Sequence, residues 1–462
     1  MIKILLNSPC NFTTSSELLT IPIGLSYIKA YCEKFFPCQI KIVPLLNSRI
    51  IKVEKPDIVG ISCYAATFGK VTALARLCKE SGVFVVAGGE QITTLPHLLT
   101  KDMDVGVRGE GEYLFLELLK VFDHGWNPKT LKSLRGLVFR DEMGDLIISE
   151  PPKKAVDLDQ LPIPDLIQGN EGTDLLCLMT SRGCPYKCIF CATGWHKNVH
   201  WMSPETLVKT IEAHLRKYPN IRRVKFWDDL FTINLSRIEK LVELILDRQL
   251  NKRLTFSVCT RADHINETLL TLLKKMNCTH VSMGLESGSD NTLKYIDKRC
   301  SSDINQHAVD LLSTHRFSSE ASFIIGFPFE TNEDIQQTYD FIKRSPIDKF
   351  QFFLPIPYPG TGLWQYVKKK GLVSEEMEWE KLDLIATMTN HKSVLKELIV
   401  ISEKLTRQEL YEWMVRFHRL SRIKTLRYAL RLLLKDPLVI FYRLKREVLF
   451  FVRKLFDKCS PC

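Results

Sequence analysis

The stretch LLCLMTSRGCPYKCIFC, residues 175–191, decides the fold of the larger part of this chain. It opens with a short apolar run typical of a buried strand and passes directly into a loop that carries Cys184, Cys188 and Cys191. Three thiolates on one short loop can hold three irons of a cubane and leave the fourth iron open to another ligand. The spacing therefore predicts an iron–sulfur cluster at the carboxyl end of a strand.

Zinc is the alternative occupant of this loop. A structural zinc site uses four protein ligands, often as paired C-x2-C units. The nearest candidates for a fourth ligand are His196 and His200. A non-catalytic zinc or iron–sulfur protein therefore stays open as a hypothesis.

Downstream of the cysteines, apolar runs alternate with helical patterns such as those at 204–218 and 234–248. Six such βα units, (β/α)6, predict a barrel-like sheet whose chemistry lies at the carboxyl ends of the strands. The predicted strands cover residues 175–181, 222–227, 254–259, 280–285, 320–326 and 349–355.

Upstream, the first 125 residues show a similar alternation with shorter units, which predicts a five-stranded, doubly wound parallel sheet of Rossmann or flavodoxin type. Residues 136–149 contain two β runs around Gly144 and predict a hairpin. A proline-punctuated segment, residues 151–166, predicts a linker. The expected units are residues 1–135, a hairpin and linker over 136–170, the barrel over 171–392 and a helical basic region over 393–462.

Composition sets limits on the class of protein. The chain has 462 residues, 45% hydrophobic and 25% charged, as in an ordinary globular protein. No stretch approaches the roughly 18 to 20 consecutive apolar residues of a membrane-spanning helix, and the polar start does not resemble a secretory signal. We therefore expect a cytoplasmic protein. Its 14 Cys are too few for a disulfide scaffold and are expected to be reduced.

The positive charge is concentrated at the carboxyl end. Residues 413–462 carry 13 Lys and Arg against 3 Asp and Glu, or +10 of the net +11. The remainder is nearly neutral, so nucleic acid is not an expected partner. Asp436 and Pro437 predict a helix start, followed by a basic, nearly amphipathic segment over 438–456. This segment predicts peripheral contact with an anionic membrane, with packing on the barrel or RNA binding as alternatives.

The cysteine loop resembles the signature of the radical S-adenosylmethionine (SAM) superfamily, which places C-x3-C-x2-C after the first strand of a partial barrel. The resemblance implies a [4Fe-4S] cluster whose open iron binds SAM, and cleavage of SAM to a 5′-deoxyadenosyl radical. Further residues at the strand ends fall where that family contacts SAM. These are Phe190 near the adenine, Asp228 and Asp229 at the amino group, Arg261 at the carboxylate, Glu286 at ribose or amino-acid groups, and Gly326 in an adenine-contacting turn.

A Rossmann-like sheet before such a barrel resembles the cobalamin (B12)-binding class of the superfamily. By this resemblance Ser62, Gly88 and Gly89 contact the nucleotide tail of cobalamin, and Glu110 marks the cofactor edge near the barrel. The Asp-x-His-x-x-Gly motif that supplies a cobalt ligand in many cobalamin domains is absent. A domain that only packs on the barrel or binds substrate is the alternative.

The resemblance implies an enzyme that methylates an unactivated carbon by means of methylcobalamin, with an electron donor such as flavodoxin or ferredoxin. A cyclisation or oxidative rearrangement, as in the anaerobic porphyrin cyclases, is the alternative within the class. A tRNA-modifying methylthiotransferase is a third hypothesis, although its amino-terminal cluster pattern and carboxyl-terminal β-barrel are not evident. The expected substrate is a small molecule, with the basic tail favouring a lipid-like one. No catalytic residue is assigned.

Overall fold

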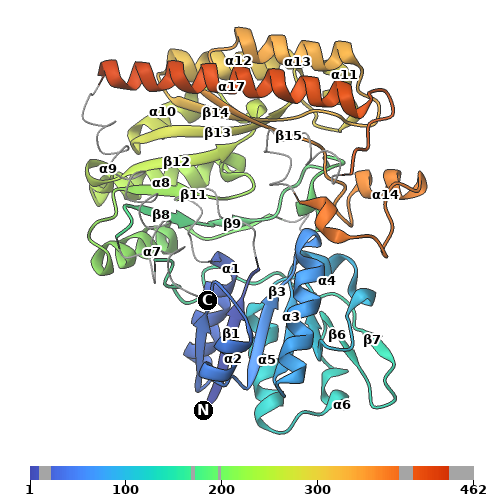
Figure 1. The fold of residues 1–462 in the computed structure, drawn as a ribbon. Helices are drawn as coiled ribbons and strands as arrows, with labels where there is room; N and C mark the ends of the chain where they lie inside the picture. The colour runs from blue at the N-terminus through green and yellow to red at the C-terminus, as the bar shows by residue number, and fades with distance from the viewer. Residues whose placement is uncertain (10–21, 168–171, 196–198, 384–398, 436–462) are drawn as a thin grey trace.

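The computed structural model describes residues 1–9, 22–167, 172–195, 199–383 and 399–435, and it contains two stacked α/β units (Figure 1). The first unit is built on a seven-stranded sheet in the order β2-β1-β3-β4-β5-β6-β7. Its strands are β1 (Ile2–Asn7), β2 (Cys38–Ile42), β3 (Ile58–Ser62), β4 (Phe84–Gly88), β5 (Val105–Val107), β6 (Leu137–Arg140) and β7 (Leu146–Ile148).

Strands β1 to β5 pair in parallel in the flavodoxin order 2-1-3-4-5, which confirms the predicted doubly wound sheet. The hairpin predicted over residues 136–149 is also present, and β6 pairs antiparallel with β5. It thereby lengthens the first sheet from the five predicted strands to seven. The helices of this unit are α1 (Ile23–Phe35), α2 (Ser48–Glu54), α3 (Phe68–Glu80), α4 (Glu90–Thr94), α5 (Glu112–Asp123) and α6 (Pro128–Leu131).

The second unit is a six-stranded, wholly parallel sheet in the order β15-β14-β13-β12-β11-β8, whose first and last strands do not pair. All six predicted strands are present, so the open barrel is confirmed. The strands are β8 (Leu175–Leu178), β11 (Arg223–Phe226), β12 (Thr255–Thr260), β13 (Cys278–Glu286), β14 (Ser318–Ile324) and β15 (Lys349–Phe353).

Helices cover one face of this sheet, and polar side chains begin several of them. The side chains of Ser203, Asn234, Asn266, Ser301 and Thr331 each accept a hydrogen bond from a backbone N–H in the first turn. The helices are α7 (Pro204–Lys217), α8 (Leu235–Asp247), α9 (Leu250–Arg253), α10 (Glu267–Lys275), α11 (Asp290–Tyr295), α12 (Ser302–Thr314), α13 (Asn332–Arg344) and α14 (Gly362–Lys369).

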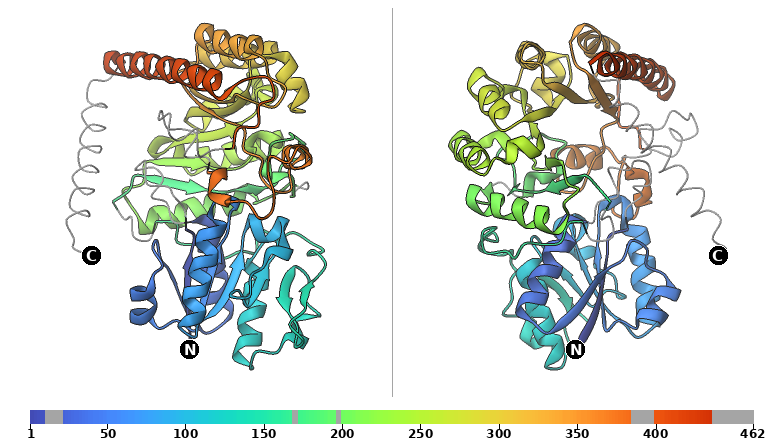
Figure 2. Two further views of the ribbon diagram at one scale, coloured as in Figure 1. Left: turned by 45° about the vertical axis from the view of Figure 1, so that its right-hand side comes forward. Right: turned by 90° about the vertical axis from the view of Figure 1, so that its left-hand side faces the viewer.

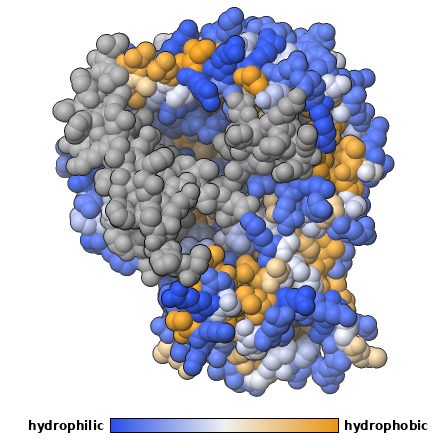
Figure 3. Space-filling model, in the orientation of Figure 1, coloured by the Kyte–Doolittle hydropathy of each residue, from blue (hydrophilic) through white to orange (hydrophobic). Residues whose placement is uncertain are grey.

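The helical pattern predicted after residue 393 is confirmed over α17 (Arg407–Lys435), which packs against β15 at the top of the barrel (Figures 1 and 2). Its Phe417 lies 5.2 Å from Phe352, ring centre to ring centre. The other face of α17 exposes Ile423, Leu426 and Leu430, and apolar side chains gather along this helix in Figure 3. Asp436, Pro437 and the basic segment over 438–456 lie outside the described residues.

A continuous core joins the two units. Leu95 after α4, Phe327 after β14, and Trp364 and Trp379 beyond the barrel share one buried apolar cluster. Among the described residues, no helix has both the length and the apolarity to cross a membrane.

Candidate functional site

The cysteine loop lies at the carboxyl end of β8 and is closed at its base by a short antiparallel ribbon of β9 (Ser181–Arg182) and β10 (His200–Trp201). Backbone bonds hold its centre: Ile189 N–H donates to Ile296 O at 3.1 Å, and Leu363 N–H donates to Ile189 O at 2.8 Å. Because α11 and α14 thereby fix the loop, its cysteines stand on a supported segment.

Cys184, Cys188 and Cys191 are all half-buried free thiols. Burial raises the pKa of Cys184 and of Cys188, and the negative charge of a Cys191 thiolate adds to this increase. The nearby Arg261 guanidinium opposes the increase at both thiols but does not cancel it. Lys298 lowers the pKa of Cys188 as well. The loop therefore offers thiols beside two fixed cations, a setting that suits an anionic thiolate-bound cluster.

The donor set fits a cluster better than a single ion. Nowhere in the described part of the chain do three His, Cys, Asp or Glu side chains converge on a point that could hold one metal ion. The thiolates of a cubane each bind a different iron, so they need not converge. His200, a candidate fourth zinc ligand, instead lies 3.0 Å from a Glu110 carboxylate oxygen, and His196 is outside the described residues.

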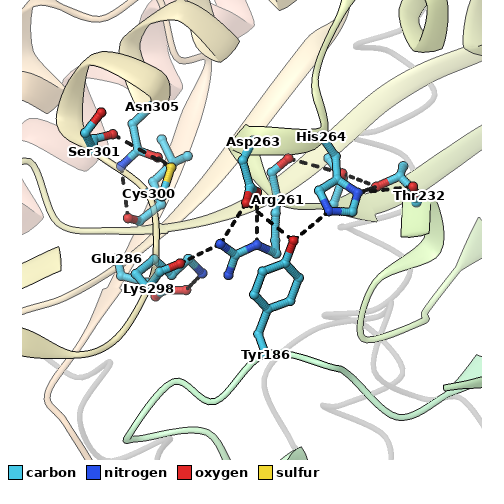
Figure 4. A network of polar contacts seen from close by, with 12 residues as sticks. Tyr186, Thr232, Arg261, Asp263, His264, Glu286, Lys298, Cys300, Ser301 and Asn305 are labelled. Carbon is cyan, nitrogen blue, oxygen red and sulfur yellow. Dashed lines mark hydrogen bonds and ion pairs between the residues drawn. The ribbon is translucent and has the colours of Figure 1, made fainter. Parts of the chain in front are cut away.

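Arg261 anchors a polar network that includes Tyr186 of the cysteine loop (Figure 4). Its guanidinium donates to both carboxylate oxygens of Asp263, at 2.9 and 3.0 Å, and to Lys298 O at 2.5 Å. It also lies 3.6 Å from the centre of the Tyr186 ring, and Tyr186 belongs to the cysteine loop. The structure thus brings Arg261 to the predicted site, where it supports the loop.

Glu286 ends β13 with a left-handed backbone, φ +66°, which is costly for a residue with a side chain. Its carboxylate accepts a hydrogen bond from the buried Lys298 ammonium at 2.8 Å. A Cβ at Gly284 would lie 2.4 Å from that carboxylate, so a larger residue there would require the Glu286 side chain to move. The predicted Glu286 therefore faces the cysteine loop as half of a buried ion pair.

The acidic pair after β11 divides into two environments. Asp228 is buried, and its carboxylate accepts from Thr180 N–H, from the Thr180 hydroxyl and from Ser181 N–H at 3.1 Å. Its bonds go to the segment that leads into the cysteine loop. Asp229 is close enough to Cys184 to raise the pKa of that thiol, and it accepts a hydrogen bond from Gly183 N–H.

Phe190 and Gly326 lie on the α14 side of the loop. The Phe190 ring is 6.0 Å from the Phe327 ring, measured between centres. Gly326 has φ +95° and donates its N–H to the buried Glu330 carboxylate at 2.6 Å. Burial raises the pKa of Glu330 to about 7. The turn after β14 is thus held by Glu330 and packs against Phe190 of the cysteine loop.

The carboxyl edge of the first sheet carries the predicted cobalamin contacts. Ser62 and Gly88 are register partners on β3 and β4, and Gly89 follows with φ +96°. A Cβ at Gly89 would lie 2.7 Å from Cys63 O and 3.2 Å from Ser62 Oγ, whereas one at Gly88 would meet nothing closer than 3.8 Å. The structure brings all three residues together, and Gly89 alone requires glycine.

The same edge holds polar groups without partners. Gln91 is 1% exposed, yet within the described residues neither its amide nitrogen nor its amide oxygen has a hydrogen-bond partner. The neighbouring Glu90 also has one such oxygen, and burial raises its pKa to about 7. Buried polar atoms of this kind fit a polar ligand on this edge, such as the tail of cobalamin.

Glu110 lies at the boundary between the two units and bonds to both the linker and the barrel. It accepts from Arg182 Nη1 at 2.6 Å and from Val156 N–H at 2.7 Å, while Arg182 Nη2 donates to Glu112 at 2.6 Å. Burial raises the pKa of Glu110, but the bonds from His200, Arg182 and Val156 outweigh it and lower that pKa to about 2. Arg182 precedes Cys184 by two residues, so this ion-pair cluster joins the first sheet to the cysteine loop.

Several site residues escaped the sequence analysis. Arg182 borders the cysteine motif, and this position was the one signal that could have identified it. Lys298 and Gln91 have no local signal, because a lysine after a helix and a glutamine in a polar turn are ordinary on a surface. Their burial against Glu286 and against the edge of the first sheet arises from tertiary contacts.

Comparison with known proteins gives two family matches. The family model of the radical SAM superfamily matches residues 178–342, and that of the B12 binding domain matches residues 12–119. An uncharacterised methyltransferase of Pyrococcus horikoshii is 31% identical over 400 residues, covering 82% of this chain and 85% of that protein.

Two further proteins are similar over most of the chain. The anaerobic magnesium-protoporphyrin IX monomethyl ester cyclase of Rubrivivax gelatinosus is 26% identical over 353 residues, covering 72% of this chain but only 62% of the cyclase. Among solved structures, the radical SAM methyltransferase TsrM of Kitasatospora setae, with cobalamin and a [4Fe-4S] cluster bound, matches with a TM-score of 0.68 at 18% identity. That match covers 80% of this chain and 78% of TsrM, and it shows a shared fold.

Proposed function

Since this chain belongs to the radical SAM superfamily and joins its barrel to a B12-binding domain, we propose that it is a cobalamin-dependent methyltransferase acting on an unactivated carbon of a small molecule. The observation that carries the proposal is the ion-pair cluster of Arg182, Glu110 and Glu112. It holds the carboxyl edge of the first sheet against the base of the cysteine loop. Two cofactors bound at these two edges would therefore share one site.

Each cofactor has residues that fit it. Cys184, Cys188 and Cys191 would hold the [4Fe-4S] cluster, while Ser62, Gly88, Gly89 and Gln91 would line the cobalamin tail. When bound, these groups supply reductive cleavage of SAM and a transferable methyl group. We propose Asp229 for the SAM amino group, because the carboxylate of Asp228 already bonds to Thr180 and Ser181. Asp228 then positions the loop. Phe190, Arg261, Glu286 and Gly326 remain proposed SAM neighbours.

The chain's own residues prepare this site. Burial raises the pKa of Cys188, and Lys298 and Arg261 place positive charge beside it that opposes this increase. Lys298 in turn holds the Glu286 carboxylate in one position. The left-handed backbone of Glu286 directs the side chain there, and the absence of a Cβ at Gly284 leaves space for it. These contacts restrain the side chains involved, which lowers the ordering cost of binding.

The test is anaerobic reconstitution followed by assays for iron, sulfide, cobalt and 5′-deoxyadenosine. We expect SAM cleavage by the wild-type protein and loss of iron in Cys184→Ala, Cys188→Ala and Cys191→Ala. Cys259→Ala is the matched control, because Cys259 is a half-buried barrel thiol outside the loop. Iron retained by the variant lacking all three loop thiols, or zinc in their place, would refute the proposal.

A radical cyclisation is the second candidate, and the similarity to the Rubrivivax cyclase favours it. The two reactions differ in product mass, because methylation adds a CH2 unit and oxidative ring formation does not. Mass spectrometry of products formed with methyl-labelled SAM separates them.

The proposed partners are a small-molecule substrate and a protein such as flavodoxin or ferredoxin, which reduces the cluster. We propose a cytoplasmic location, with peripheral membrane contact through the basic carboxyl-terminal segment. Deleting residues 436–462 should then release the protein from vesicles containing anionic lipid but leave its weak affinity for neutral vesicles unchanged. Equal binding of the full and shortened chains to anionic vesicles would remove the membrane contact. The domain boundaries at residues 135, 170 and 392 stay predictions.

A further inference from the structure

The inner face of the open barrel is polar. Along each strand from β11 to β15, buried and partly exposed residues alternate, and the buried ones, such as Phe226, Phe256 and Phe323, pack on the side of the helices. Closed (β/α) barrels fill their interior with branched aliphatic side chains. Here the middle of the inner face instead carries Lys225, Ser257, His280, Ser282, Glu320 and Lys349.

All of these side chains except Ser282 border a cavity of about 440 Å³, which lies within the range of small-molecule sites. The strand register sets them side by side in two rows. Lys225, Ser257 and His280 are register partners in one row, and Glu320 and Lys349 are partners in the next. The polar surface is therefore continuous across five strands.

Positive charge exceeds negative charge in this cavity. Arg223 has its own acid, Asp174, at 2.8 and 2.9 Å, and Arg431 pairs with Asp348. Glu320 is then the acid that faces both lysines, and the charges of Lys349 and Lys225 help to lower its pKa. The carboxylate of Glu320 is itself engaged by Gln351 at 3.0 Å and by His280 at 3.4 Å.

Neither lysine donates to a carboxylate within the described residues. The Lys225 ammonium lies 5.2 Å from the centre of the Trp227 ring, and that of Lys349 lies 4.9 Å from the Tyr428 ring centre. A cation over an aromatic face retains its hydrogen-bond donors for another partner. Lys225 on β11 and Lys349 on β15 therefore both offer free hydrogen-bond donors to the same cavity.

We propose that this cavity binds an anionic group of the substrate, a phosphate or a carboxylate, through Lys225 and Lys349. The inference rests on the proposed function and names the class of its substrate. A charged, water-soluble molecule fits this lining, whereas a lipid-like one would desolvate the two lysines without offering them a partner.

The cavity lies on the amino-terminal side of the cysteine site, because Arg223, Thr255 and Lys349, which begin β11, β12 and β15, line it. Cys259 on β12 is influenced by the charges of Lys225 and Glu320, which line the cavity, and by those of Asp228 and Asp229 after β11. Asp229 in turn acts on Cys184. A substrate anchored by its anionic end in the cavity would extend toward the carboxyl ends of the strands, where the radical chemistry takes place.

Calorimetric titration of the reconstituted protein tests the proposal, with inorganic phosphate in one arm and succinate in the other. We expect saturable binding of at least one anion, weakened about tenfold or more in Lys225→Met and in Lys349→Met, since each removes a charge-assisted donor. Lys225→Arg and Lys349→Arg should restore binding. Lys240→Met is the matched control, because Lys240 lies half exposed on α8 and pairs with Glu243.

Tighter binding of phosphate would assign a phosphate-bearing substrate, and tighter binding of succinate would assign a carboxylate. The proposal is overturned if neither anion binds, or if both methionine variants bind as the wild type does while retaining its iron content and circular dichroism. SAM cleavage, measured separately, tests the proposed function. Loss of anion binding with 5′-deoxyadenosine production intact would identify the lysines as substrate contacts.

Discussion

Replacing Arg182 with methionine is expected to lower the free energy of unfolding by about 3 kcal/mol, because it removes the cation from a buried ion-pair cluster. The side chain of Arg182 is 13% exposed, and those of Glu110 and Glu112 are 8% and 3% exposed. Removing one partner of a buried pair costs roughly 3–5 kcal/mol. We expect the lower end of this range, because Glu110 keeps its bonds from His200 and Val156.

Glu112 carries most of this cost. Its Oε1 accepts from Arg182 at 2.6 Å, and its other carboxylate oxygen has no partner among the described residues. In the variant this buried carboxylate faces an apolar methionine and has lost its cation. A buried charge without a partner is costly.

The assay is urea denaturation of the full chain at neutral pH, followed by tryptophan fluorescence. Because a chain of two units can unfold in steps, limited proteolysis of the linker over residues 151–166 provides a second measure. A loss of about 3 kcal/mol corresponds to roughly a hundredfold larger open population, which speeds cleavage in proportion.

The matched control is Arg76→Met, since the Arg76–Glu80 pair has side chains 73% and 62% exposed. Exposed pairs contribute about 0–1 kcal/mol, so this variant should unfold almost as the wild type does. If Arg182→Met costs no more than Arg76→Met, the argument that this cluster holds the two units together is wrong.

Three further outcomes are expected. Gly89→Ala should lower the free energy of unfolding by roughly 1–3 kcal/mol and reduce cobalamin retention, because φ +96° and Cys63 O exclude a Cβ. Gly88→Ala is the control and should retain cobalamin, so equal cobalt content in the two variants would contradict this. The pKa of Glu110 is lowered to about 2 from its usual 4.5, so its ion pair stabilises the fold above pH 4.5 and is lost as the pH falls toward 2. Wild-type stability should therefore decline more steeply over that interval than that of Glu110→Gln, and parallel declines would refute the assignment. Asp228→Asn should cost about 2 kcal/mol and weaken iron retention, because an amide nitrogen replaces one acceptor facing Thr180; normal iron content would argue against a positioning role.

Both α/β units could be predicted from the sequence because their signals are local. Alternating apolar runs and capped helices predict each strand of the barrel, and the three cysteines lie within eight consecutive residues. The hairpin over residues 136–149 was also predictable, but its pairing with β5 was not. Strand pairing across a sheet depends on contacts between distant segments.

The candidate site shows the same division. Cys184, Cys188 and Cys191 needed only their spacing, since one loop carries all the ligands. The different environments of Asp228 and Asp229 could not be predicted, because adjacent acids look alike until the fold buries one against Thr180. Lys298 meets Glu286, and Arg182 meets Glu110, across 12 and 72 residues of chain. Local pattern is sufficient where neighbours in the chain act together. The contacts that join the two units, and the grouping of charged side chains inside the barrel, arise only when the folded backbone brings remote side chains within a few ångströms.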